Sequence, residues 1–149
     1  MRVSLPFSPV PVTGQTFFVL LSGALLGRRL GPASQLLYGG LACVLPGVTA
    51  GPLHLTAGYV IGFVAAAYIV GALVGESRSY GRVMPAMVVG SLVIYLLGAA
   101  WLAGATGNLR AAVLQGVVPF LPGDALKLLA AAAVVTGSRA VQARAGGRQ

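Results

Sequence analysis

The chain has 149 residues, of which 57% are hydrophobic and 8% are charged, and its formal net charge is +8. A soluble domain has about a quarter of its residues charged, so this composition excludes that class and indicates an integral membrane protein. The basic excess does not indicate binding to nucleic acid, because the arginines stand between or after apolar runs without interleaved aromatic residues.

Apolar runs bounded by Arg, Gly and Pro predict an all-α fold, a polytopic transmembrane helical bundle of about five spans. We interpret 1–149 as a single transmembrane domain, with a Pro-rich lead-in over 1–12 and an Arg-rich tail over 138–149. The first two spans are short against the roughly 20 residues that a bilayer requires. In chain order, the spans are expected at about Thr13–Gly27, Ala33–Leu45, Ala57–Gly75, Val83–Gly104 and within Ala111–Gly137.

The arginines predict the orientation, because cytoplasmic loops carry the excess of Lys and Arg. Arg28 and Arg29 follow the first span, and Arg78 and Arg82 follow the third. The tail holds three more arginines, whereas the alternate loops hold few. We therefore expect a multi-pass protein of the plasma membrane with a cytoplasmic C-terminus. The N-terminus and the segments Pro46–Thr56 and Thr106–Gly123 are expected on the outer side.

Glycines at four-residue spacing, such as Gly58 and Gly62, let helix backbones approach closely within a membrane. We interpret them as sites of packing inside the bundle rather than as a dimerisation face. Two further segments, Pro46–Gly51 and Pro119–Gly123, are predicted to break helices. Broken backbone at membrane depth is tolerated where protein or a polar cavity surrounds it, so both are candidate rims of an outer binding site.

Enzyme chemistry is not expected. The only acidic residues are Glu76 and Asp124, which the topology places on opposite sides of the membrane, so no carboxylate pair is available for catalysis or for a metal. His54 is the only histidine, and Cys43 is the only cysteine. We expect His54 to be an ordinary loop residue, and we expect no catalytic residue, metal or cofactor.

Asp124 and Lys127 form the leading candidate site. A charge at membrane depth costs roughly 2.5–3.5 kcal/mol on insertion scales, so it is usually retained where it faces a partner or a ligand. If Gly123 opens the last helix, the two side chains share one face of its first turn. Asp124 is also explained as a helix cap, whereas Lys127 opposes the helix dipole there. It could snorkel to the surface, neutralise Asp124, or present a donor to a small polar ligand beside the carboxylate.

Three polar clusters on the outer side suggest a single outward-facing pocket. Tyr59 begins the third span there, although an interfacial tyrosine is commonly a membrane anchor. Thr13 and Gln15 lie near the start of the first span, where the alternative role is helix capping.

The same segments, in order across about 6–130, resemble the BioY family, the biotin-binding S component of energy-coupling-factor transporters. The matching segments are Pro6-Phe7-Ser8-Pro9-Val10-Pro11-Val12-Thr13-Gly14-Gln15-Thr16-Phe17, Leu25-Leu26-Gly27 with Leu30-Gly31, Leu36-Leu37-Tyr38, Thr56-Ala57-Gly58-Tyr59-Val60-Ile61-Gly62-Phe63 and Pro119-Phe120-Leu121-Pro122-Gly123-Asp124-Ala125-Leu126-Lys127.

The resemblance implies a bundle of six helices that captures biotin near the outer surface. It also implies a transmembrane coupling subunit and two cytoplasmic ATPases as partners, with a homo-oligomer as the alternative. ATP chemistry would belong to those partners, since the chain has no GxxxxGK[ST] loop. Asp124 and Lys127 would contact the polar groups of the ligand, and Gly58 and Tyr59 would shape the pocket wall. Thr56, Thr13 and Gln15 would join them as parts of matching segments.

The sequence departs from the family pattern at two places. Family members usually carry another helix before the Pro-rich segment. We expect this chain to lack that helix, which agrees with the odd number of spans expected here. The segment between Pro46 and Thr56 is also shorter than usual, with His54-Leu55 in place of Gly-Pro. Three alternatives therefore stay open beside biotin capture: a membrane scaffold that binds no solute, a degraded paralogue, and a binder of another vitamin.

Overall fold

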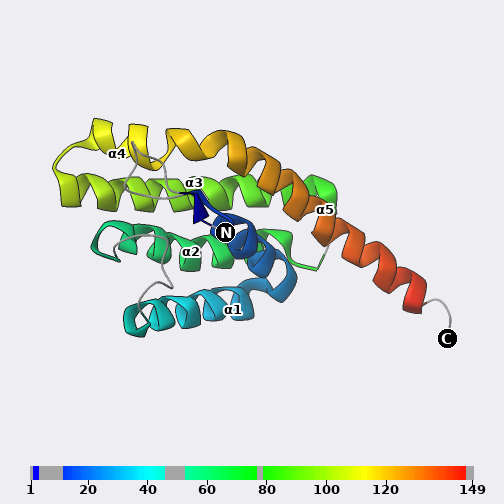
Figure 1. Cartoon of the computed structure of the whole chain (residues 1–149). Helices are drawn as coiled ribbons and strands as arrows, with labels where there is room; N and C mark the ends of the chain where they lie inside the picture. Colours follow the sequence, from blue (N-terminus) through cyan, green and yellow to red (C-terminus); the bar gives the residue numbers. More distant parts are fainter. Residues whose placement is uncertain (1, 4–11, 46–52, 77–78, 147–149) are drawn as a thin grey trace.

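The structure is a computed structural model that describes the backbone over 2–3, 12–45, 53–76 and 79–146, and side chains over 14–45, 54–76 and 79–138. Helices dominate it, which confirms the predicted all-α class (Figure 1). A short antiparallel pair of strands, β1 (Arg2–Val3) and β2 (Val12–Thr13), precedes them. Thr13 therefore ends a strand, and the first helix begins at Gln15.

The helix α1 (Gln15–Val44) contains the first two predicted spans as two arms joined at Gly27, whose φ of 79° and ψ of −175° are not helical. The first arm (15–26) and the second arm (28–44) fold back on each other, since Gln35 of the second reaches Ser22 of the first. The predicted end of the first span at Gly27 is confirmed. The predicted connection that would hold Arg28 and Arg29 is wrong, because both arginines already lie in the second arm.

The helices α2 (Leu53–Val74) and α3 (Tyr80–Thr106) form the centre of the bundle. The second arm of α1 flanks α2, while α4 (Leu109–Gly116) and α5 (Leu121–Gly146) run along α3 (Figure 1). Three stretches in the described residues are long and apolar enough to cross a membrane: His54–Val74, Tyr80–Thr106 and Leu109–Ser138. His54 lies in the first turn of α2 rather than in a loop, so that prediction is wrong.

The last span is interrupted, as the prolines predicted. The helix α4 begins at Leu109 after Asn108, whose side chain accepts a hydrogen bond of 3.0 Å from the Ala111 N–H. A 3-10 turn, η1 (Val118–Phe120), separates α4 from α5. The new helix begins at Leu121, two residues before the expected Gly123, so the latter part of Pro119–Gly123 is helical. The other predicted break, Pro46–Gly51, lies outside the described residues.

The glycines pack helices inside the bundle, as we interpreted them. A Cβ added to Gly58 would lie 2.2 Å from Trp101 Cβ, and one added to Gly62 would lie 3.1 Å from Ile94 Cα. The backbones of α2 and α3 thus approach closely, which is the main source of association between helices in lipid.

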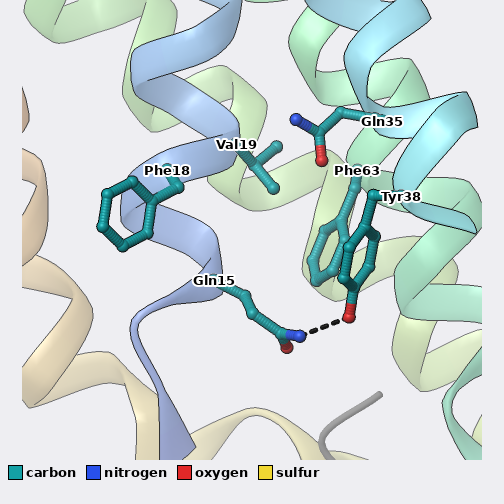
Figure 2. Close-up of a pocket in the computed structure, with 6 residues that line it drawn as sticks. All are labelled: Gln15, Phe18, Val19, Gln35, Tyr38 and Phe63. Atoms are coloured by element: carbon teal, nitrogen blue, oxygen red, sulfur yellow. Dashed lines mark hydrogen bonds between the residues drawn. The ribbon is translucent and has the colours of Figure 1, made fainter. Parts of the chain in front are cut away.

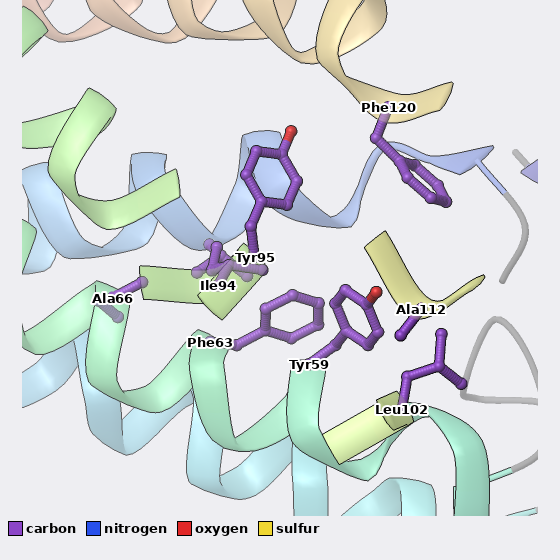
Figure 3. Packing of buried hydrophobic residues seen from close by; sticks show 10 residues of the cluster. Tyr59, Phe63, Ala66, Ile94, Tyr95, Leu102, Ala112 and Phe120 are labelled. Carbon is purple, nitrogen blue, oxygen red and sulfur yellow. The ribbon is translucent and has the colours of Figure 1, made fainter. Parts of the chain in front are cut away.

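Two clusters of buried side chains fill the bundle. One lies toward the end that carries α4 and includes Tyr59, Phe63, Tyr95 and Phe120 (Figure 3). The other fills the opposite end between α1, α2, α3 and α5, with Leu20, Val70, Met87 and Val135 among its members. The first of these, the aromatic cluster, reaches the predicted site through Tyr95, whose hydroxyl bonds to Asp124.

Candidate functional site

Asp124 lies in the first turn of α5 and is 4% exposed. Lys127 Nζ stands 2.6 Å from Asp124 Oδ1, so the expected pairing on one helix face is confirmed. The lysine neutralises the carboxylate within the protein, which was one of its three expected roles.

Two more donors reach the same carboxylate from other helices. The Thr16 hydroxyl of α1 donates to Oδ1 over 3.1 Å, and the Tyr95 hydroxyl of α3 donates to Oδ2 over 2.5 Å. A buried charge is tolerated when it is paired and its lone pairs are used. Asp124 meets this condition, and its carboxylate joins α1, α3 and α5 at one point.

One acceptor position of the carboxylate is still available. The two oxygens of an ionised carboxyl group offer about four lone-pair sites in total. Lys127 and Thr16 both bond to Oδ1, whereas Tyr95 is the one donor to Oδ2 among the described residues. A further donor therefore has a place at Oδ2.

Tyr59 is a buried residue of the aromatic cluster and is 7% exposed. Its hydroxyl donates to the Gly116 carbonyl of α4 over 2.8 Å, so the alternative role as a membrane anchor is wrong. Gly58 and Thr56 precede it on α2, and both are buried. Gly58 packs α2 against Trp101 of α3, and Tyr59 bonds α2 to α4.

A cavity of about 250 Å³ opens between the two arms of α1 and α2, and Gln15 forms part of its wall (Figure 2). The Gln15 amide donates to the Tyr38 hydroxyl across the arms. Gln15 and Thr13 do not cap α1, because the cap residue is Gly14 and no side chain caps it. The side chain of Thr13 lies outside the described part of the chain. The six lining residues are Gln15, Phe18, Val19, Gln35, Tyr38 and Phe63.

The first turn of α1 contributes to both the cavity and the carboxylate site. Gln15 lines the cavity, while its neighbour Thr16 bonds to Asp124. Asp124 and Lys127 themselves do not line this cavity. The structure therefore brings part of the predicted site together at Asp124 and leaves Gln15 on the adjacent face of one helix turn.

The sequence reasoning missed Thr16, Tyr95, Gln35 and Tyr38. Each is a neutral polar residue inside an apolar run, and its partner is 13 to 108 positions away. Their position inside predicted spans was the one available signal, since polar groups that a span removes from water are normally hydrogen-bonded. No group of three or more His, Cys, Asp or Glu side chains suited to a metal occurs in the part of the chain that the structure describes.

The BioY family model matches residues 1–144. The chain belongs to the BioY family. A probable biotin transporter BioY of Pyrococcus horikoshii is 40% identical over 145 residues, which cover 93% of this chain and 85% of that protein. The biotin transporter BioY of Thermotoga maritima is 34% identical, with 89% and 82% covered.

A solved structure shares the fold. The S component for biotin from an ECF-type ABC transporter superposes with a TM-score of 0.80 at 23% sequence identity, over 93% of this chain and 80% of that one. Membership of this transporter family, together with the three apolar helical stretches, identifies a multi-pass membrane protein.

Proposed function

We propose that this chain is the substrate-binding membrane component of a biotin uptake transporter, with Asp124 and Lys127 at its ligand site. The observation that carries the proposal is an ion pair of 2.6 Å between the buried Asp124 and the half-buried Lys127 in a member of the BioY family. The proposal also takes support from the relatives, which are described as biotin transporters.

The chemistry of biotin suits this pair. Its ureido ring offers two N–H donors and one carbonyl acceptor. An N–H would bond to Asp124 Oδ2, and the carbonyl would accept from Lys127, whose ammonium has three N–H groups. A site built on such bonds rejects analogues that lack them, because its buried groups would be left unpaired.

The remaining predicted residues would form the wall of this site. Tyr59, Gly58 and Thr56 are buried on α2, and Gln15 borders the adjacent cavity. We place Thr13 with them on its position in the matching segment. Apolar side chains of the aromatic cluster would pack against the thioether ring and the aliphatic tail.

The energy for uptake would come from partner proteins. We propose a transmembrane coupling subunit and two cytoplasmic ATPases, with a homo-oligomer of this chain as the alternative assembly. The chain carries no phosphate-binding GxxxxGK[ST] loop, which agrees with that division of work. We also propose the single transmembrane domain with its C-terminal tail in the cytoplasm, in agreement with the distribution of arginines.

Titration of purified protein with biotin tests the site. We expect Asp124→Asn and Lys127→Ala each to weaken binding by about 1.5–3 kcal/mol, the usual range for a hydrogen bond to a charged group. Arg110→Ala is the matched control, since it removes an exposed cation from α4. Equal affinity in all four proteins would refute the ligand site, and absence of binding by the folded wild-type protein would refute the function.

A further inference from the structure

The cavity between the arms of α1 holds a polar group that the proposed function does not use. Gln35, on the second arm, is 8% exposed and lies among apolar side chains of the wall (Figure 2). Its amide nitrogen donates to Ser22 Oγ over 3.0 Å and to Ser34 Oγ over 3.1 Å.

The two serines fix which way the amide points. The Ser22 hydroxyl donates to the Val19 carbonyl over 2.8 Å, and the Ser34 hydroxyl donates to the Gly31 carbonyl over 2.6 Å. A hydroxyl has one hydrogen, so both serines act toward Gln35 as acceptors. Gln35 must therefore turn its NH₂ group to the serines and its oxygen away from them.

The oxygen faces the cavity without a donor. Figure 2 shows it pointing into the ring of lining residues, between Val19 and Phe63. Among the described residues no hydrogen bond reaches it, while both hydrogens of its NH₂ group are used. Gln35 is 8% exposed and its oxygen is open to the cavity, so a donor on a bound molecule can reach this acceptor.

We propose that this cavity is a binding site for an uncharged, mainly apolar group that carries one N–H or O–H donor for Gln35 Oε1. Phe18, Val19 and Phe63 would contact the apolar body. A carboxylate would be excluded from this end, because it would place an anionic acceptor against the amide oxygen. The volume of about 250 Å³ suits a small molecule or one part of a larger one.

Indole is a suitable probe, because it is apolar and has one N–H donor, and 1-methylindole is its counterpart without the donor. The protein, labelled with ¹⁵N-glutamine in lipid nanodiscs, would be titrated with each while the side-chain amide signals are followed by NMR. We expect indole to shift the Gln35 signal saturably, with an affinity about tenfold higher than that of 1-methylindole. Gln115, an exposed glutamine of α4, gives the internal reference.

Two variants support the measurement. Gln35→Met assigns the signal by removing it, and Phe63→Trp fills the cavity while keeping Gln35, so it should abolish the shift. The comparison of the two indoles in the wild-type protein needs neither variant. Equal affinities for the two indoles, or no saturable shift of Gln35, would overturn the inference.

The donor can come from the ureido N–H of biotin or from a separate molecule. A titration with biotin distinguishes these two sources. If biotin shifts Gln35 and displaces indole, the cavity belongs to the substrate site. If indole binds unchanged at saturating biotin, the cavity takes a second ligand. The indole result stands apart from the proposed function, because it does not require biotin to bind.

Discussion

Asp124 connects three helices through the hydrogen bonds of its carboxylate. These bonds compensate for the unfavourable burial of its charge. Thr16, Tyr95 and Lys127 each supply one donor to its carboxylate. Removing one partner from a buried charged group is destabilising, because the other groups are left without compensation. Each donor is therefore expected to affect stability as well as ligand binding.

Tyr95→Phe tests this at the residue scale. The variant keeps the ring and removes the donor to Asp124 Oδ2, so we expect the free energy of unfolding to fall by about 1–3 kcal/mol. Thermal unfolding in detergent without ligand measures the loss as a lowered melting temperature. Tyr68→Phe is the control, since Tyr68 is 53% exposed on α2. If both variants melt at the same temperature, Tyr95 does not stabilise the carboxylate.

The sequence predicted the pairing of Asp124 with Lys127, because residues three apart on a helix share a face. It did not predict Thr16 or Tyr95, which lie 108 and 29 positions from Asp124. Such contacts depend on how the helices are arranged, and an apolar run has no periodic signal for one neutral polar residue. The ligand site remains a prediction at each of its residues.

At the scale of the element, Gly27 makes the reversal of α1 possible. Its φ of 79° lies in the left-handed region, where a Cβ is disfavoured. We expect Gly27→Ala to destabilise the protein by about 1–3 kcal/mol, because this φ combined with a ψ of −175° is adopted almost only by glycine. Gly40→Ala in the second arm is the control, since nothing lies within 4 Å of the added Cβ. The melting temperatures of both variants are compared with that of the wild-type protein. An unchanged melting temperature for Gly27→Ala would contradict the strained turn.

The contact of α2 with α3 gives a second test. A Cβ at Gly98 would lie 2.2 Å from Tyr59 Cε1, whereas nothing lies within 4 Å of one at Gly104 on the same helix. We expect Gly98→Ala to cost about 1–3 kcal/mol by overpacking. Gly104→Ala should instead be neutral or stabilising, because Ala favours helix by about 1 kcal/mol over Gly. The Gly98→Ala variant should thus have a lower melting temperature than the wild-type protein, and the Gly104→Ala variant an equal or higher one. Equal shifts of both melting temperatures would refute the close packing.

Element boundaries were predicted best where glycine or proline interrupts an apolar run. Gly27 and the break before α5 belong to this class. The sequence did not predict that one residue would suffice for the turn, because Arg28 and Arg29 suggested a polar loop. The helix instead continues through both arginines, whose side chains are exposed.

At the scale of the whole molecule, the arginine distribution predicts opposite sides of the membrane for the two ends of α3. Ser79 precedes the helix, and Ala105 lies in its last turn, and both are exposed. In a Cys43→Ser background, Ala105→Cys should react with an impermeant maleimide in intact cells. Ser79→Cys should react after permeabilisation. Reaction of Ser79→Cys in intact cells would reverse the proposed orientation and place the C-terminal tail outside.

The one-residue turn at Gly27 also limits how the chain can change in length. Each residue of an α-helix turns the next side chain by about 100°. An inserted residue between Ser22 and Gln35 would rotate the second arm and carry the Gln35 amide away from its serines and from the cavity. The segment between Ser22 and Gln35 should therefore tolerate substitutions at its exposed positions far better than insertions or deletions.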